Sequence, residues 1–414
     1  MNTLLYRLGT GAYHAAIQLG SVLGVRRARQ WTDGRKNQPP VPADLHRGRP
    51  LIWMHCASLG EWEQGRPVMA AFRKRHPEYR ALLTFYSPSG YDRCRNEPSV
   101  DHVAYLPADT PKKAKAWVRQ VRPALAVFVK YEFWFFHLRA LSDADVPTFL
   151  VAASFRAEQP FFRATGGWWR ALLGSFSGVV VQQRPAAELL TGPGNYPEER
   201  VCVAGDPRMD RTLELADQPF EDDIVAAFTA GVGPVIVAGS VWPEDTRALW
   251  AAWAGLSANT RIILAPHQLQ GQEIARAQVR WEALRYTETT PEEVTGARVL
   301  ILDTIGILSR VYRYGDVAYV GGAFRTGLHN TLEPLAYELP VVFGPQHRKF
   351  PEAAAMIAAG GGFSVQDGTE LGEVLQRLLR PEERAVAAGA QVRLARQWAG
   401  AAERTVTAVD AWLA

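Results

Sequence analysis

The 414-residue chain has little cysteine, little excess charge and no long hydrophobic run. Its three cysteines are far apart and form no CxxC or Cys/His spacing, so we expect neither a disulfide framework nor structural zinc. The net charge of +4 is too small to indicate a nucleic-acid partner. Within residues 3–25, Arg7 and His14 interrupt the apolar pattern, so we expect no membrane-spanning helix and no secretory signal there.

Several common catalytic motifs are also missing. No GxxxxGK[ST] loop or GxSxG elbow occurs, and no GxGxxG follows the first predicted strand. These absences disfavour Walker-type nucleotidases, α/β-hydrolases and dinucleotide oxidoreductases. The Asp-x-Asp sequence at 143–145 precedes a predicted strand, where we expect solvated loop acids, so we predict no metal site.

What the chain does contain is an ordinary globular composition, 47% hydrophobic and 21% charged, over a length typical of two domains. Short apolar runs alternate with longer amphipathic segments, which predicts parallel sheets covered by helices. The first set of predicted strands is 51–56, 80–86, 102–106, 124–129, 148–152, 178–182 and 200–204. The second set is 234–238, 261–265, 284–287, 299–302, 317–320 and 341–343, with helices beginning near Pro243, Thr304 and Asn330.

The two sets predict two doubly wound, Rossmann-like α/β domains. We place the first at residues 36–212 and the second at 213–414, with 205–220, which lacks an apolar run, as the connection. Ligands of doubly wound sheets bind at the carboxyl ends of strands. Functional residues are therefore expected directly after strands, in a cleft between the domains.

Residues 1–35 form a separate amphipathic segment. On a helix, the apolar residues that share one side are Leu5, Leu8, Ala12, Ala16, Leu19 and Leu23. Arginines follow at positions 26, 27 and 29. Two interpretations stay open: a helix lying in the membrane surface with its basic end on anionic headgroups, or a helix packed on its own domain.

A glutamate stands where the first predicted strand turns into a helix, in HCASLGEW (55–62). We expect Gly60 to ease the turn or a close approach to a ligand, and Glu61 to open the helix. The helix dipole stabilises an acidic side chain in the first helical turn, so one interpretation gives Glu61 a structural role only. At the carboxyl edge of a strand, Glu61 could also take a proton from an attacking hydroxyl.

The stretch 320–345, VGGAFRTGLHNTLEPLAYELPVVFGP, places a glycine-containing loop before a helix near Asn330. Exposed amides at such a helix start favour an anion. Asn330 and Glu333 have capping-box spacing, so Glu333 either satisfies the backbone of Asn330 or accepts hydrogen bonds from a nucleotide's sugar. His329 either fills the loop or donates to a phosphate or carboxylate.

Two further helix starts follow strands of the second set. In VAGSVWPED (237–245), we expect Gly239 and Ser240 to bring backbone amides and a hydroxyl to a phosphate. The segment DTIGILSR (303–310) offers another helix start at the same edge. Together these starts indicate a nucleotide or other anionic donor held without metal.

Two charged residues follow neighbouring strands of the first set. Glu132 comes after 124–129, and Arg156 occupies the matching place after 148–152. Each either forms a structural ion pair or contacts an acceptor.

Taken in order, these segments resemble 3-deoxy-D-manno-octulosonic acid (Kdo) transferases, which add Kdo to the lipid A precursor in lipopolysaccharide synthesis. The resemblance runs from the N-terminal segment to about residue 365. It is sharpest at ASLGE (57–61), YEFW (131–134), GDPRMD (205–210), DTIGIL (303–308), GGAFRTGLHNTLEP (321–334) and VVFGP (341–345). In this combination and order the motifs are highly specific.

The resemblance implies a GT-B architecture, CMP-Kdo as donor substrate, no cofactor, and inversion at the anomeric carbon without a metal. It implies that the N-terminal domain binds the acceptor, that the C-terminal domain binds CMP-Kdo, and that the enzyme works at the cytoplasmic face of the inner membrane. The family's base, the glutamate of its Ser-x-Gly-Glu motif, falls on Glu61. Its GHNxLEP motif, which helps to hold the nucleotide, falls on residues 328–334, with Leu328 where glycine is usual.

On this basis we assign the candidate residues. The catalytic base is Glu61. The donor-binding candidates are Ser240, Trp242, His267, Gly306, Arg325, His329, Asn330 and Glu333. The acceptor-binding candidates are Ser58, Gly60, Glu132, Arg156 and Arg208. Many members have Pro-Arg-His at 266–268, where this chain has Pro-His-Gln, so that arginine contact is missing or is supplied by Arg325 or Arg348.

Two rival functions are consistent with the same pattern. One is a GT-B transferase that uses a UDP-sugar on another lipid or glycan acceptor. The other is a non-catalytic scaffold at the membrane surface that keeps a nucleotide-binding cleft. The sequence leaves the oligomeric state open.

Overall fold

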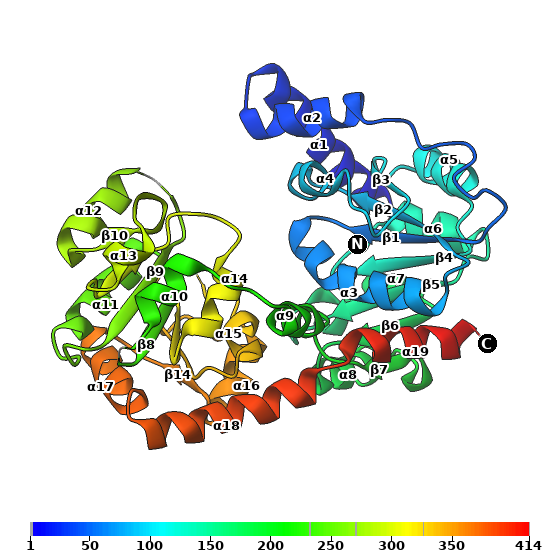
Figure 1. The fold of residues 1–414 in the computed structure, drawn as a ribbon. Helices are drawn as coiled ribbons and strands as arrows, with labels where there is room; N and C mark the ends of the chain where they lie inside the picture. The colour runs from blue at the N-terminus through cyan, green and yellow to red at the C-terminus, as the bar shows by residue number, and fades with distance from the viewer. Residues whose placement is uncertain (1–2, 232, 270, 326, 414) are drawn as a thin grey trace. The chain divides into compact units, whose positions relative to one another are not determined.

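The computed structural model describes residues 3–231, 233–269, 271–325 and 327–413 (Figure 1). It divides into two compact units. The first is Met1–Asp210 with Gly400–Ala414, and the second is Arg211–Ala399. Each unit contains one parallel seven-stranded sheet, which confirms the predicted pair of doubly wound α/β domains.

The sheet of the first unit has the strand order β3-β2-β1-β4-β5-β6-β7. Its strands are β1 (Leu51–Cys56), β2 (Arg80–Phe85), β3 (His102–Tyr105), β4 (Leu125–Val129), β5 (Thr148–Ala153), β6 (Gly178–Val181) and β7 (Val201–Val203). Its helices are α1 (Thr3–Val22), α2 (Arg26–Asn37), α3 (Leu59–Arg75), α4 (Pro88–Cys94), α5 (Pro111–Val121), α6 (Phe135–Ser142), α7 (Gly167–Leu173) and α8 (Arg184–Thr191), joined by α19 (Ala401–Leu413). Helix α9 (Arg208–Asp217) begins at the end of this unit.

The sheet of the second unit has the order β10-β11-β9-β8-β12-β13-β14. Its strands are β8 (Val235–Val241), β9 (Arg261–Pro266), β10 (Leu284–Arg285), β11 (Val299–Ile301), β12 (Val317–Val320), β13 (Val341–Phe343) and β14 (Gly362–Ser364). Its helices are α10 (Asp223–Thr229), α11 (Pro243–Trp253), α12 (Gly271–Trp281), α13 (Pro291–Val294), α14 (Leu308–Val311), α15 (Leu332–Ala336), α16 (Pro351–Ala359), α17 (Gly368–Leu378) and α18 (Pro381–Trp398).

The central strands have no polar face. All six residues of β1 are buried, because successive side chains enter two separate cores on opposite faces of the sheet. Trp53 packs in one of these cores and Met54 in the other. This double burial explains why the strands read as continuous apolar runs in the sequence.

Each sheet has one topological switch point. In the first sheet the chain moves from β1 to β2 and β3 on one side, and β4 begins the series on the other side. In the second sheet β8 and β12 occupy the corresponding positions. Ligands of open α/β sheets bind where the strand order reverses in this way. Functional residues are therefore expected in the loops after β1, β4, β8 and β12.

The C-terminal helix corrects the predicted domain of residues 213–414. Helix α19 belongs to the first unit, where the side chains of Val406 and Val409 enter its core and Trp412 stacks on Phe149 of β5. The carboxylate of Asp210 accepts hydrogen bonds from two backbone N–H groups at the start of this helix. Helix α19 therefore belongs to the first unit because its apolar face packs on that unit's core, although it follows the second unit in the sequence.

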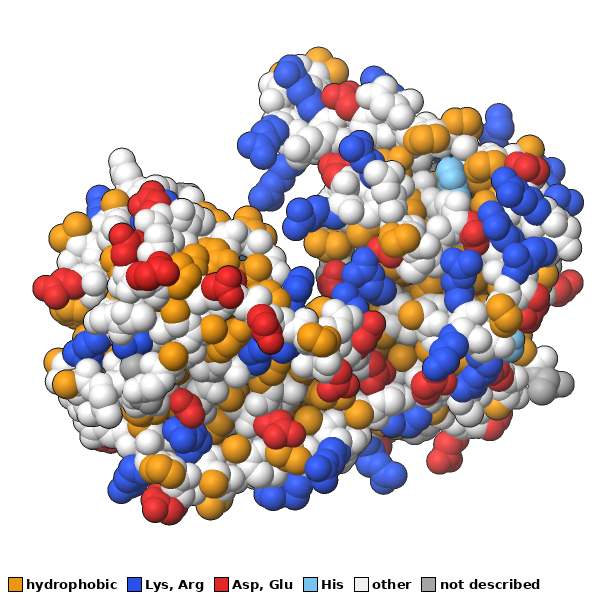
Figure 2. Space-filling model, in the orientation of Figure 1, with side chains coloured by type: hydrophobic (Ala, Val, Ile, Leu, Met, Phe, Trp, Pro, Cys, Tyr) orange, Lys and Arg blue, Asp and Glu red, His pale blue; other side chains and the backbone are white. Residues whose placement is uncertain are grey.

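The N-terminal helix packs on its own unit with one side and exposes leucines on the other. Tyr6 contacts the rings of Phe135, Phe136 and Trp168, and its hydroxyl donates to the carboxylate of Asp109. The exposed side carries Leu4, Leu5, Leu8, Leu19 and Val22. Within the part of the chain that is described, no helix is long and apolar enough to cross a membrane. Figure 2 shows Lys and Arg side chains gathered over α2.

Some local details differ from the predictions. The boundary between the two units, at Asp210 and Arg211, falls within the predicted connection 205–220, but this segment also contains helix α9. The helix expected near Asn330 begins at Leu332, as predicted, whereas the one expected near Thr304 begins only at Leu308, and the short strand β14 was not predicted. Strand β13 was predicted with the bounds that are observed, whereas β14 has only three residues and is too short for periodicity to reveal.

Candidate functional site

Glu61 lies at the switch point of the first sheet and closes a capping box. Helix α3 begins at Leu59, with Ser58 as its N-cap. The Oε2 atom of Glu61 accepts hydrogen bonds from the backbone N–H of Ser58, at 2.9 Å, and from its hydroxyl. The other oxygen, Oε1, has no hydrogen-bond partner among the described residues, and the side chain is half-buried. The cap therefore fixes the carboxylate while leaving one oxygen available to a ligand.

Of the two roles predicted for Gly60, the structure contradicts the first, easing a tight turn. It lies inside the first turn of α3 and is exposed, and a Cβ placed there would meet only the Ser58 hydroxyl, at 3.8 Å. The turn does not need glycine at this position. The absence of a side chain instead leaves the surface beside Glu61 open.

Glu132 lies after β4, the strand next to β1, where Trp134 holds its carboxylate and His55 lies beside it. Its Oε2 accepts a hydrogen bond of 2.6 Å from the indole N–H of Trp134. The Nε2 atom of His55, at the end of β1, lies 3.3 Å from the same oxygen. The Nδ1 atom of His55 is in turn 2.9 Å from the hydroxyl of Thr84. His55 is fully buried, and sequence reasoning missed it, although a histidine in the apolar strand LIWMHC was a signal.

The carboxylates of Glu61 and Glu132 both affect the pKa of one buried thiol, that of Cys56. Burial raises the pKa of Cys56 well above its usual value, and the carboxylates of Glu61 and Glu132 raise it further. Both carboxylates lie near the end of β1, since Glu61 is in the first turn of the helix that follows this strand and Glu132 lies beside His55 of the strand. The structure thus brings the predicted base and one predicted acceptor residue together.

The other predicted acceptor residues are not part of this pair. Arg156 is exposed in the loop after β5, where its backbone N–H donates to Gln159. Arg208 lies at the start of α9, and Asp206 accepts two hydrogen bonds of 3.0 and 2.6 Å from its Nε and Nη2 atoms. Arg208 is therefore ion-paired with its neighbour Asp206, and its predicted contact with the acceptor stays a prediction.

In the second sheet, close backbone packing shapes the switch point. Ser240 has a left-handed backbone (φ +54°), and the register of β8 with β9 shifts beside it. A Cβ on Gly321 would lie 2.4 Å from the carbonyl oxygen of Ser240, so only glycine fits after β12. Gly322 is also left-handed (φ +96°), and a Cβ there would press on the ring of His329.

Four of the predicted donor residues form one stack at this edge. The rings of Trp242 and His267 are 4.4 Å apart, and those of His267 and His329 are 4.3 Å apart. The guanidinium of Arg325 lies over Trp242, 4.3 Å from the ring centre. The stack occupies the carboxyl edge of β8, β9 and β12 and presents one cation and two imidazoles.

The hydrogen bonds of the stack fix a tautomer. The indole N–H of Trp242 can only donate, and it lies 2.9 Å from Nε2 of His329. Nε2 is therefore the acceptor, and the proton of the neutral ring is on Nδ1. Burial and the neighbouring His267 lower the pKa of His329 to about 4. Burial, with a smaller effect of Arg325, also lowers the pKa of His267. His329 is thus a neutral donor at neutral pH.

Asp245 organises the loops that carry the stack, and sequence reasoning missed it. Its fully buried carboxylate accepts hydrogen bonds from the backbone N–H groups of Trp242 and Gly322 and from the hydroxyl of Tyr319. Burial raises its pKa despite these three donors. The signal was its place in WPED, two residues after a proline that begins α11.

Asn330 and Glu333 pair through their side chains. The amide of Asn330 donates to Glu333 at 3.1 Å, and its oxygen accepts from the backbone N–H of Leu332. This arrangement differs from the predicted capping box, because Thr331 occupies the N-cap of α15. Gly306 lies in an exposed loop two residues before the four-residue helix α14, with φ +99°.

Comparisons with known proteins agree with these features. A family model described as 3-deoxy-D-manno-octulosonic-acid transferase matches residues 27–211. A 3-deoxy-D-manno-octulosonic acid transferase from Bordetella pertussis is 30% identical over 391 residues, covering 87% of each chain. One from Chlamydophila psittaci is 27% identical, covering 84% of this chain and 81% of that protein.

Solved structures support the fold. A UDP-GlcNAc 2-epimerase from Neisseria meningitidis superimposes with a TM-score of 0.64 at 12% identity, covering 87% of this chain and 99% of that one. A glycosyltransferase from Rickettsia africae gives a TM-score of 0.59 at 10% identity, covering 88% and 98%. At these identities the likeness concerns the GT-B-like architecture alone. The sequence matches decide the family: the chain belongs to the Kdo transferases, the glycosyltransferases of lipopolysaccharide synthesis.

Proposed function

We propose that this Kdo transferase moves Kdo from CMP-Kdo to the lipid A precursor lipid IVA, inverting the anomeric carbon without a metal or cofactor. In this scheme Glu61 takes the proton from the acceptor hydroxyl while the bond between Kdo and CMP breaks. The hydroxyl oxygen attacks the anomeric carbon, CMP leaves as a phosphate anion, and the proton stays on Glu61. The observation that carries the proposal is the capped carboxylate of Glu61, which keeps one oxygen free at a switch point.

The donor side of the proposal uses the stack after β8, β9 and β12. Arg325 supplies a positive charge, and His329 supplies the Nδ1 proton that its pairing with Trp242 leaves free. These groups are positioned before the reaction, so they can stabilise the charge of the departing phosphate at low reorganisation cost. We propose that Glu333, which pairs with Asn330, accepts hydrogen bonds from the ribose.

On the acceptor side, Glu132 is proposed to orient the sugar beside Glu61. Its carboxylate is already held by Trp134, which limits its movement and leaves its Oε1 atom for a ligand. We further propose that the enzyme works at the cytoplasmic face of the inner membrane. The exposed leucines of α1 and the arginines that begin α2 support that location.

Incubation with a lipid A precursor separates this function from its rivals. The donor is either CMP-Kdo generated in situ or a set of UDP-sugars, and the product is identified by mass spectrometry. We expect addition of Kdo only with CMP-Kdo. A product formed only with a UDP-sugar would refute the donor, and no product with either donor would support a scaffold.

A further inference from the structure

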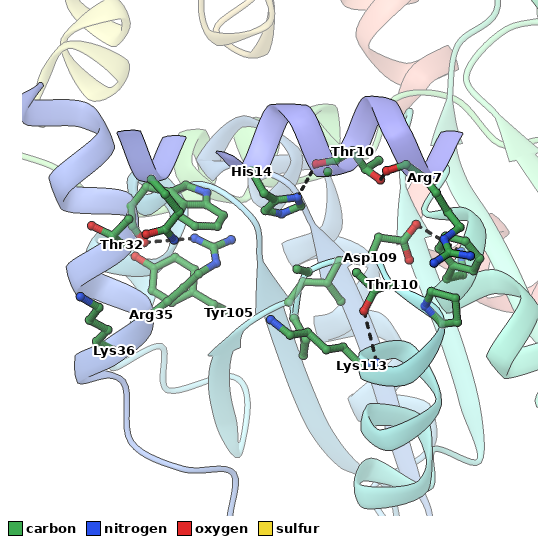
Figure 3. A pocket seen from close by; sticks show the side chains of 18 of the residues that line it. Arg7, Thr10, His14, Thr32, Arg35, Lys36, Tyr105, Asp109, Thr110 and Lys113 are labelled. Carbon is green, nitrogen blue, oxygen red and sulfur yellow. Dashed lines mark hydrogen bonds between the residues drawn. The ribbon is translucent and has the colours of Figure 1, made fainter. Parts of the chain in front are cut away.

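A cavity of about 610 Å³ lies in the first unit, between helices α1 and α2 and the loop that joins β3 to α5. Figure 3 shows His14 on α1 above this space, Arg35 and Tyr105 beside it, and Lys113 reaching in from α5. It is separate from the β1–β4 switch point, since neither Glu61 nor Glu132 lines it. The mechanism proposed above gives it no role.

The cavity wall is cationic and lacks counter-ions. Arg7, Arg35, Lys36 and Lys113 line it, and among the described residues none of them has a carboxylate within ion-pair distance. Arg35 is the most enclosed of the four. Its guanidinium lies 3.5 Å from the ring centre of Trp31 and 4.5 Å from that of Tyr105. Burial lowers the pKa of Arg35 to about 10. The Nη2 atom of Arg35 donates to the carbonyl oxygen of Tyr86 at 2.7 Å, but among the described residues no carboxylate balances its charge. A buried cation without a counter-ion is unfavourable, so an anion would stabilise this wall.

The carboxylate of Asp109, which also lines the cavity, already accepts hydrogen bonds from protein groups. Asp109 is fully buried and accepts hydrogen bonds from the hydroxyl of Tyr6, from the backbone N–H groups of Phe136 and His137, and from the His137 ring. Donors of the protein therefore already satisfy its carboxylate. Around Arg35, the Nε atom, the indole nitrogen of Trp31 and the hydroxyl of Tyr105 have no hydrogen-bond partner among the described residues.

The surroundings favour an anion that belongs to a lipid. Helix α1 forms one wall of the cavity, and its outer side exposes Leu4 and Leu8, each 61% accessible. A second cavity of about 840 Å³ shares Trp31 and is lined largely by apolar and small residues, including Ile17 and Val25. A charged cavity thus lies beside a mainly apolar cavity, next to a helix with exposed leucines. This change in polarity matches the change from a lipid headgroup to the start of its acyl chains.

We propose that this cavity binds a phosphate ester of a lipid headgroup, with Arg7, Arg35 and Lys113 as its ligands. The inference rests on the proposed function only in taking a lipid as acceptor. Two sources of the phosphate share this chemistry: the phosphorylated sugar of the acceptor itself and the anionic phospholipid of the bilayer. In either case the site would hold the lipid surface against the acceptor-binding unit.

Helix α5 offers a matched test, because Lys112, Lys113 and Lys115 are all exposed and only Lys113 lines the cavity. Calorimetry of the full chain, without donor, measures binding of a deacylated, bisphosphorylated glucosamine disaccharide. Losing one charge-assisted hydrogen bond corresponds to a loss of about tenfold or more. We therefore expect Lys113→Glu and Arg7→Glu each to weaken binding by at least that factor. Lys112→Glu and Lys115→Glu should stay within about twofold, because neither side chain lines the cavity and a charge outside it is screened by solvent.

Three results would overturn the proposal: equal losses in all the lysine variants, equal affinity for the unphosphorylated disaccharide, or equal affinity for inorganic phosphate. Association with vesicles of phosphatidylcholine, with and without phosphatidylglycerol, distinguishes the sources. If Lys113→Glu weakens only the binding of the disaccharide, the phosphate belongs to the acceptor. If it weakens only association with phosphatidylglycerol vesicles, the phosphate belongs to the bilayer. Because no transfer is measured, failure of the proposed reaction would leave these results unaffected.

Discussion

Lowering the pH should break the stack of Trp242, His267 and His329 at a defined point. The neutral ring of His329 accepts the indole proton of Trp242 at Nε2, and a protonated ring cannot accept it. Since its pKa is lowered to about 4, the folded state resists protonation that the unfolded chain accepts near pH 6.5. The contribution of His329 to stability is therefore complete above pH 6.5 and is lost as the pH falls through about 4.

The size of this loss of stability follows from the difference between the pKa values of His329 in the unfolded and folded chain. From 6.5 to about 4, at about 1.4 kcal/mol per pH unit, the upper limit is roughly 3.4 kcal/mol. The ring is only half-buried, so solvent screening reduces the expected loss to about 2 kcal/mol or less. A bound phosphate beside Nδ1 would oppose the effect and raise the pKa of His329.

Two measurements check the prediction. An NMR titration of histidine side chains, with His329→Asn to assign the signal, should place the midpoint near 4 without ligand and higher with CMP. Urea unfolding at pH 7 and at pH 4.5 should show a larger loss of stability in the parent chain than in His329→Asn. A midpoint near 6.5, or equal losses in both proteins, would refute the tautomer and the stack.

Three further predictions concern other parts of the molecule. Trp412→Ala should lower the free energy of unfolding of the first unit by about 2 kcal/mol, because a half-buried tryptophan that stacks on Phe149 is removed; an unchanged urea midpoint would mean that α19 is not part of that unit. Transfer should continue at the same rate in excess EDTA, since the proposed chemistry uses protein donors at the phosphate; a rate restored only by added metal would contradict this. Replacing Leu4 and Leu8 by aspartate should weaken association with phosphatidylglycerol vesicles by at least about tenfold, because both side chains are exposed on α1; undiminished association would favour a helix that serves only its own domain.

The strands could be predicted because nearly all of them are buried on both faces. Residues 51–56 were predicted exactly, and the apolar run there admits no polar interruption except His55. The place of α19 could not be predicted, since it depends on which sheet surface the helix covers and not on its own pattern. Similarly, α14 and β14 are held by their neighbours, with too few residues of their own to show a period.

The residues of the candidate site could likewise be predicted only in part. Residues that follow strands, such as Glu61 and Trp242, were found because parallel strands end at a common edge. His55 and Asp245 were missed because their importance lies in contacts with partners distant in sequence: His55 with Glu132, and Asp245 with Gly322. The ion pair of Arg208 with Asp206, a neighbour two residues away, was also not predicted.

Replacing Glu61 by glutamine tests the central claim most directly. Glutamine keeps an oxygen that can accept from the backbone of Ser58, so α3 should remain capped, and Glu63→Gln on the same helix serves as the control. The account predicts that Glu61→Gln lowers kcat by about 10²- to 10⁴-fold, while CMP binding and the unfolding midpoint match those of the control. A Glu61→Gln enzyme that transfers Kdo at the parent rate would show that another group removes the acceptor proton.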